Sequence, residues 1–164
     1  MIALDLDGTI LNYGSHVTEI RINHALLSLL PRQRQPVVIL TNQGGVALWR
    51  SDPNKYPSPE HVGWRLDAAC TFLAEREYQT VAIYASCYHP RAQAVDVQWA
   101  AATLRGEIAS LVPSWRVYTT ERARKPHPLM LRAAGATVYY GDSPEDGQAA
   151  AAAGIPFVSV PRFE

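Results

Sequence analysis

The sequence has few cysteines, no long apolar run and no excess of charge of either sign. Its two cysteines, Cys70 and Cys87, are too few for a disulfide framework, which favours a reducing, cytoplasmic location. No apolar run approaches the roughly 20 residues that a membrane span requires, and the start lacks a signal-peptide pattern, so we expect neither a membrane partner nor a leader. The formal net charge is +0, and no Lys/Arg-rich block marks a nucleic-acid surface.

Strand and helix patterns alternate along a chain of 164 residues, a length that suits a single domain, 1–164. Short apolar runs predict strands at the start and at 36–41, 80–85, 137–141 and 156–160. Helical patterns are found at 18–30, with Thr18 as N-cap, and at 58–73, 97–111, 128–134 and 144–153. Residues 115–118 fit either a short strand or a packed loop.

This alternation predicts an α/β fold with a doubly wound, Rossmann-like parallel sheet. We expect about five strands with helices on both faces. The strands read as continuous Val/Ile/Leu runs because a parallel sheet covered by helices is buried on both sides.

Polar side chains follow several of the predicted strands, at the point where each strand ends. Asp5 and Asp7 close the first strand, Thr41 and Asn42 close the second, and Asp142 closes the fourth. An isolated Asp-x-Asp-Gly-Thr fits a solvated turn equally well. Because ligands of open α/β sheets bind beyond the carboxyl ends of the strands, the recurrence at several strands predicts one site on that edge.

The same residues resemble the four motifs of the haloacid dehalogenase-like phosphohydrolases. Asp5-Leu-Asp-Gly-Thr9 is similar to the first motif, Thr41 to the second, Lys125 to the third and Gly141-Asp142-Ser-Pro-Glu-Asp146 to the fourth. They occur in the family's order, and the resemblance covers essentially the whole chain. It implies a Mg²⁺-dependent phosphomonoester hydrolase, a phosphatase that acts through an aspartyl-phosphate intermediate.

The resemblance implies metal and proton-transfer roles for three aspartates. A phosphate dianion repels a carboxylate nucleophile, so a hard cation with oxygen ligands has to cancel charge first. Asp5 would be the nucleophile and a metal ligand, and Asp142 the second metal carboxylate. Asp7 would protonate the leaving oxygen, deprotonate the hydrolytic water and bind the metal through its main-chain carbonyl.

Further residues are implied to bind the phosphate. Thr41 would donate its hydroxyl to a phosphoryl oxygen, assisted by main-chain N–H groups around Leu6, Asp7 and Asn42. Lys125 would neutralise the transferring phosphate and keep the nucleophile ionised.

The role of the acidic pair after Asp142 stays open at this point. The family places a carboxylate four residues later, at Asp146, which either holds the metal's water or steadies the lysine. Glu145 competes for that role, and an acidic first helical turn is favoured by the helix dipole in any case.

The intervals between the motifs leave no room for a cap domain. The segments Thr41-Asn-Gln-Gly-Gly-Val46 and Arg124-Lys-Pro-His-Pro-Leu-Met130 resemble the capless branch that contains histidinol-phosphate, heptose-bisphosphate and polynucleotide 3′-phosphatases. The implied partner is a phosphorylated substrate, either a polynucleotide 3′-phosphate or a small sugar or amino-alcohol phosphate.

Loop residues near the predicted site are candidates for substrate contact. Cys87-x-His89 stands where some of that branch carry a zinc loop, but no further cysteine follows, so we expect no structural zinc. Arg91 and Arg124 are candidate substrate ligands, although each alone is equally a surface charge. Further candidates are His89, Trp49, Arg50, Lys55, Tyr56 and Arg122.

Two non-enzymatic alternatives use the same residue types. A receiver-like signalling domain carries its phosphorylated aspartate at the end of the third strand, whereas here that strand ends at Ala85 without a carboxylate. A non-catalytic phosphate-binding scaffold is the second alternative, although every residue that catalysis needs is present. The sequence sets neither the oligomeric state, the pathway nor whether a partner chain supplies a lid.

Overall fold

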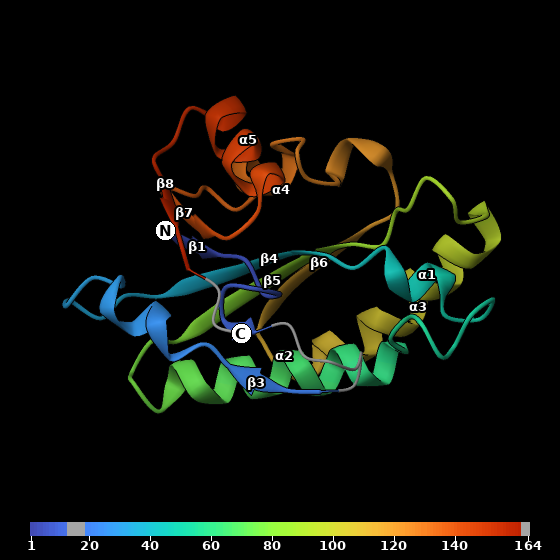
Figure 1. The fold of residues 1–164 in the computed structure, drawn as a ribbon, viewed down its shortest axis with the longest axis horizontal. Helices are drawn as coiled ribbons and strands as arrows, with labels where there is room; N and C mark the ends of the chain where they lie inside the picture. Colours follow the sequence, from blue (N-terminus) through green and yellow to red (C-terminus); the bar gives the residue numbers. More distant parts are fainter. Residues whose placement is uncertain (13–18, 162–164) are drawn as a thin grey trace.

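The computed structural model describes residues 1–12 and 19–161 (Figure 1). Six strands form one parallel sheet in the order β6-β5-β4-β1-β7-β8. They are β1 (Ile2–Leu4), β4 (Val37–Asn42), β5 (Thr80–Ser86), β6 (Ser114–Tyr118), β7 (Val138–Gly141) and β8 (Phe157–Ser159). The predicted α/β class is confirmed, with six strands in place of about five because residues 114–118 pair with β5.

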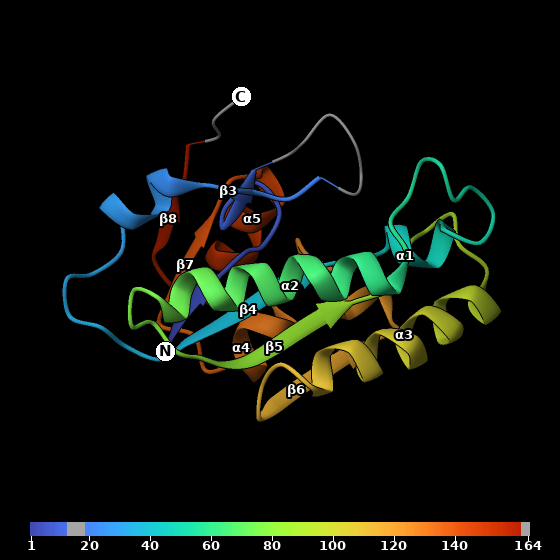
Figure 2. The ribbon, with the colours of Figure 1, turned by 90° about the horizontal axis from the view of Figure 1, so that it is seen from below.

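Helices cover both faces of this sheet (Figure 2). The α-helices are α1 (Gly45–Leu48), α2 (Pro59–Ala74), α3 (Ala94–Ala109), α4 (Leu129–Ala133) and α5 (Pro144–Ala153), and two 3₁₀ helices are η1 (His24–Ser28) and η2 (Glu121–Ala123). Helices α2 and α3 lie on one face, called here the α2/α3 face. Helices α4 and α5 lie on the other, the α4/α5 face.

The helix starts predicted from the sequence are confirmed where capping residues set them. Ser58 caps α2 by accepting a hydrogen bond from the His61 N–H, ahead of a proline in the first turn. Ser143 and Asp146 form a capping box at the start of α5, and Gly154 ends that helix with φ of 72°. These local signals do not depend on the rest of the fold, which is why they could be read in advance.

The helix predicted over 18–30 is wrong. The chain there forms β3 (Arg21–Ile22), antiparallel to β2 (Leu11–Asn12), and helical turns are confined to η1. The buried side chain of Asn23 accepts a main-chain N–H of η1 and donates to a carbonyl of the preceding loop at 3.0 Å. Such side-chain bonds compete with helix formation. Thr18, the predicted N-cap, lies outside the described residues.

Two further differences are smaller. Helix α3 begins at Ala94, three residues before the predicted start, and the short helix α1 follows β4 where only a turn was expected. In the described part of the chain, no helix has the length and apolar character needed to cross a bilayer.

The order of the strands creates a crevice between β1 and β7. The chain leaves β1 towards β4 and leaves β7 towards β8, which are opposite directions across the sheet. Loops that diverge in this way leave an opening beyond the carboxyl ends of the two strands. The Asp5 N–H donates to the Tyr140 carbonyl at 2.9 Å, which fixes the two strand ends in register. Asp5 and Asp142 therefore lie at the opening.

Candidate active site

A cavity of about 500 Å³ opens at the carboxyl ends of β1, β4 and β7. Most of the predicted site residues meet there, although they come from segments far apart in the sequence. The lining consists of Asp5, Asp7, Thr41, Asn42, Arg124, Lys125, Pro126, Asp142, Ser143 and Glu145. The convergence of three strand ends on one cavity is what a parallel sheet with a switch in strand order provides.

Lys125 is buried at the base of this cavity, where its ammonium group is surrounded by oxygen atoms. Its Nζ donates to Asp5 Oδ1 and Asp146 Oδ1, both at 2.8 Å, and to the Tyr139 hydroxyl at 2.7 Å. The Leu40 carbonyl lies 3.3 Å away. Burial acts to lower the pKa of Lys125, but the two carboxylates outweigh it and the net shift is upward. The lysine is therefore a fixed positive charge.

The Asp5 carboxyl is almost fully buried beside that charge. Its second oxygen, Oδ2, accepts a hydrogen bond from the Thr9 hydroxyl at 3.3 Å. Burial raises the pKa of Asp5 well above its ordinary value, opposed by Lys125 and reinforced by the negative charge of Asp146. A nucleophilic carboxylate has to be ionised, so a cation bound next to Asp5 would oppose the effect of burial.

Asp146 steadies the lysine, which is one of the two roles that the sequence leaves open for it. Its Oδ1 accepts from Lys125 and from the Tyr139 hydroxyl at 2.8 Å. Its Oδ2 accepts from the main-chain N–H groups of Asp142 and Ser143, both at 3.2 Å. Burial acts to raise the pKa of Asp146, but Lys125 and these donors outweigh it and the pKa is lowered. Asp146 is thus held ionised.

A glycine makes this close arrangement of β7 and α5 feasible. A Cβ at Gly141 would lie 2.6 Å from the Asp146 side chain, closer than real side chains approach, so only glycine fits at the end of β7. Glu145, the competitor of Asp146, is exposed and lines the cavity. Of the two acidic residues in this turn, Asp146 therefore lies in the interior and Glu145 lies at the cavity.

Asp7 is held from two sides by residues that the sequence analysis missed. Arg65 of α2 donates from Nη2 to Asp7 Oδ1, and Gln43 donates from Nε2 to Asp7 Oδ2 at 3.0 Å. The same Gln43 nitrogen lies 2.8 Å from the Thr41 hydroxyl oxygen, so one amide links the first and second motifs.

The missed residues differ in how visible they are in the sequence. Arg65 stands three residues after Val62, and so on the apolar stripe of α2, where an arginine is unexpected and is therefore a signal. Gln43 directly follows Thr41 and Asn42. Tyr139 carried no signal, because tyrosine is common in strands.

Two of the residues predicted to bind phosphate through the main chain also organise the site. The Asn42 side chain donates to the Lys125 carbonyl at 3.1 Å and accepts from the Lys125 N–H at 3.0 Å, which ties the lysine to β4. The Leu6 side chain is fully buried, and its carbonyl accepts N–H groups from residues 9–11 at 3.0–3.3 Å. Gly8 completes this tight loop with φ of 84°.

Of the two arginines predicted to bind substrate, Arg124 lies at the cavity and Arg91 lies outside it. Arg124 lines the cavity and donates to the Tyr88 carbonyl at 2.8 Å. Arg91 is exposed, donates to the Tyr56 hydroxyl at 2.9 Å and is not among the lining residues. Burial, followed by the charges of Arg124 and Arg91, lowers the pKa of His89, which makes it neutral at physiological pH.

Other candidate residues of this region contact α3 or the core. Trp49 stacks on Trp99 with ring centres 5.9 Å apart, and the Arg50 guanidinium lies 4.8 Å from the same Trp99 ring. Cys87 is buried in the core, where burial raises the pKa of its thiol to about 12.

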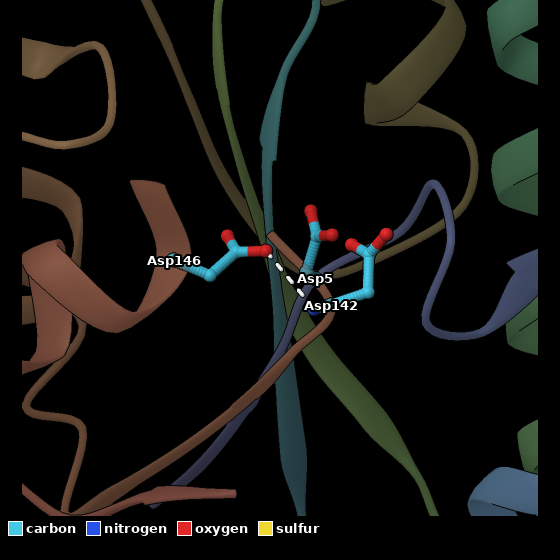
Figure 3. A group of neighbouring side chains, drawn as sticks. All are labelled: Asp5, Asp142 and Asp146. Atoms are coloured by element: carbon cyan, nitrogen blue, oxygen red, sulfur yellow. Dashed lines mark hydrogen bonds between the residues drawn. The ribbon is translucent and has the colours of Figure 1, made fainter. Parts of the chain in front are cut away.

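Three carboxylates offer oxygen atoms for a cation. Asp5, Asp142 and Asp146 each provide one oxygen within 4.8 Å of the others, and Asp146 reaches toward the other two from α5 (Figure 3). Asp5 and Asp142 line the cavity, whereas Asp146 is buried and is not among the lining residues. The donor set that fits a hard cation such as Mg²⁺ is therefore Asp5 and Asp142 at the cavity, with water and substrate oxygens.

Comparisons of the chain with family models, with curated proteins and with solved structures found no match.

Proposed function

We propose that this chain is a Mg²⁺-dependent phosphomonoester hydrolase that acts through an aspartyl-phosphate formed on Asp5. The observation that carries the proposal is the setting of Asp5, whose carboxyl lies 2.8 Å from the Lys125 ammonium and within 4.8 Å of an Asp142 oxygen. A carboxylate beside a fixed cation and a possible metal ligand, at the edge of an open cavity, suits attack on an anionic phosphorus centre.

In the proposed reaction Asp5 attacks phosphorus and later releases phosphate to water. A Mg²⁺ held by Asp5 and Asp142 would neutralise the phosphate dianion and reduce its repulsion of the nucleophile. Lys125 keeps Asp5 in position and adds a second positive charge, and the Thr41 hydroxyl is available to a phosphoryl oxygen. Asp5, Thr41 and Asp142 lie at strand ends, and the Lys125 main chain is hydrogen-bonded to Asn42 of β4, which supports a preorganised site.

Asp7 supplies the proton transfers of both steps. As the general acid it protonates the leaving alcohol, and as the general base it then removes a proton from the attacking water. Asp7 lines the same cavity as Asp5, which supports this assignment. Positioned acid–base help of this kind contributes roughly 10²–10⁴-fold.

The substrate is either a polynucleotide 3′-phosphate or a small sugar or amino-alcohol phosphate. Arg124 on the cavity lining suits an additional anionic group in either class. Salt separates the two, because cleavage of a 3′-phosphorylated oligonucleotide weakens steeply with salt if several phosphates are bound. The free thiols of Cys70 and Cys87 support a reducing compartment such as the cytoplasm.

Purified protein assayed with a chromogenic phosphate ester tests the proposal. We expect Mg²⁺-dependent turnover that a chelator removes and that Asp5→Asn lowers by roughly 10³-fold or more. Asp52→Asn, at an exposed position in the loop after α1, is the matched control and leaves turnover unchanged. Full activity in Asp5→Asn contradicts the proposal, and stable phosphorylation without turnover supports the receiver-like alternative.

A further inference from the structure

We propose that Arg65 is the positioning residue that aims Asp7 at the leaving group. The inference rests on the proposed function, since it concerns the residue proposed as general acid and base. It adds a residue outside the four motifs, contributed by α2, a helix that supplies none of the cavity lining.

Arg65 connects three separate parts of the fold. It is only 8% exposed, although it projects from the middle of α2. Its Nη2 donates to Asp7 Oδ1, and its Nη1 donates to the Glu19 carbonyl at 2.5 Å. The two terminal nitrogens of the planar guanidinium therefore bind different segments. One donates to the loop after β1, and the other donates to the main chain just before β3.

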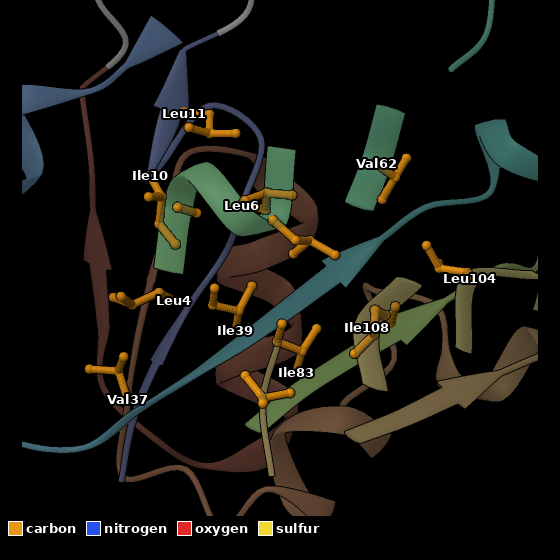
Figure 4. Close-up of a cluster of buried hydrophobic side chains, with 14 of the residues drawn as sticks. Leu4, Leu6, Ile10, Leu11, Val37, Ile39, Val62, Ile83, Leu104 and Ile108 are labelled. Atoms are coloured by element: carbon orange, nitrogen blue, oxygen red, sulfur yellow. The ribbon is translucent and has the colours of Figure 1, made fainter. Parts of the chain in front are cut away.

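The position of Arg65 is costly for packing. Its neighbour on the stripe, Val62, belongs with Leu6 to the large apolar cluster, where Figure 4 shows both side chains. A buried arginine has to be desolvated, and a buried ion pair contributes less to stability than well-packed apolar side chains often do. The stability of the fold therefore gives little reason for an arginine at this point, whereas orientation of Asp7 does.

The two donors on Asp7 fix the plane of its carboxyl group. Gln43 holds Oδ2 from the turn after β4, while Arg65 holds Oδ1 from α2. A carboxylate has about four lone-pair sites, so each oxygen retains capacity for a substrate or water proton. The Asp7 side chain is 28% exposed, which leaves it accessible from the cavity. Without Arg65 only Gln43 would hold this carboxyl group, so its orientation towards the leaving oxygen would be less well defined.

The dependence of rate on the leaving group distinguishes positioning of Asp7 from general support of the fold. p-Nitrophenyl phosphate releases a stable phenolate that needs little protonation, whereas glycerol 2-phosphate releases an alkoxide that needs a proton donor. We expect Arg65→Gln to lower the single-turnover rate of alcohol release, which reports the phosphoryl-transfer step alone, by about 10–100-fold for glycerol 2-phosphate and by less than about 3-fold for the nitrophenyl ester. Arg65→Lys, which keeps the charge, restores part of the loss.

The matched control is Arg105→Gln on α3. Arg105 also donates to a main-chain carbonyl, that of Val117 at 3.3 Å, but contacts no cavity residue. We expect this variant to leave the ratio of the two rates unchanged. If Arg65→Gln fails to fold, Arg65→Lys tests the same ratio with a smaller expected change, because a lysine keeps the charge but cannot make both hydrogen bonds of the guanidinium.

The possible outcomes distinguish failure of the role proposed for Arg65 from failure of the proposed phosphatase function. An active wild-type protein whose ratio is unchanged in Arg65→Gln and in Arg65→Lys overturns this inference and leaves the proposed function intact. An equal loss of the single-turnover rate of alcohol release for both esters also overturns it, since it assigns Arg65 a purely structural part. An inactive wild-type protein, or an active Asp5→Asn, overturns the proposed function itself.

Discussion

The α2/α3 face of the sheet buries large aliphatic side chains, such as Leu4, Ile39 and Leu104 (Figure 4), whereas the α4/α5 face buries Lys125 and Asp146. Apolar burial stabilises a fold roughly in proportion to area. A buried ionic network contributes little net stability but is costly to break on one side. The comparison teaches that the larger apolar cluster lies on the α2/α3 face, whereas the α4/α5 face combines a smaller apolar cluster with the buried Lys125 network, so substitutions in the cluster and in the network should differ in kind.

Lys125→Met is expected to have the largest effect on the α4/α5 face. It removes the ammonium shared by Asp5 and Asp146 and leaves their carboxyl groups buried together. We expect the free energy of unfolding to decrease by about 3–5 kcal/mol, measured by urea denaturation, and phosphatase turnover to be lost. The exposed Lys55→Met is the control for the unfolding measurement. A decrease below about 1 kcal/mol contradicts the view that this lysine holds the network together.

Leu104→Ala tests the α2/α3 face. The side chain is fully buried on α3 and is not among the residues that line the active-site cavity, so its truncation creates a void in the core. We expect a decrease of about 3 kcal/mol in the free energy of unfolding with kcat unchanged at temperatures where the variant is folded. If kcat decreases along with stability, the two faces are not separable.

Tyr139→Phe and Tyr78→Phe make a matched pair across the faces. Each substitution removes one tyrosine hydroxyl. The Tyr139 hydroxyl is hydrogen-bonded to Lys125 and Asp146, whereas the Tyr78 hydroxyl donates to the Pro31 carbonyl. We expect both to decrease the free energy of unfolding by about 1–2 kcal/mol. Only Tyr139→Phe should also lower kcat, because only that hydroxyl contacts the lysine. Equal kcat values for the two variants contradict the assignment of the network to the site.

Asp5→Asn should have the smallest effect on stability, and in the opposite direction. Burial raises the pKa of Asp5 above its unfolded value of about 3.9, so its stabilising contribution is complete below that pH and is lost as pH rises through the folded pKa. At pH 7 without metal we expect the variant to be more stable by roughly 1 kcal/mol. The difference should disappear towards pH 4 in denaturant titrations, and a less stable variant at pH 7 contradicts this.

Much of the site could be predicted because its residues occupy positions that the topology determines. Asp5 and Asp142 directly follow strands and Thr41 lies near the end of β4, and parallel strands bring their carboxyl ends to one edge whatever the details of packing. The capping residues of α2 and α5 were equally readable, since their hydrogen bonds are local.

The remaining features depend on contacts between distant segments. Arg65 and Gln43 meet Asp7 only once α2 and the turn after β4 are packed, and neither contact has a local pattern. Tyr139 joins the lysine network because strand alternation points it to the α4/α5 face. The prediction of a helix over 18–30 was wrong because the hydrogen bonds of the Asn23 side chain are made to residues distant in the sequence.

Trapping the phosphorylated nucleophile tests the central claim most directly. Protein mixed with Mg²⁺ and a phosphate ester is quenched during turnover and reduced with borohydride, which converts an acyl phosphate to the corresponding alcohol, and the peptides are then mapped by mass spectrometry. We expect Asp5 to be converted to homoserine, with no such product in Asp5→Asn. Turnover that proceeds without modification of Asp5, or modification of another carboxylate in its place, contradicts the account.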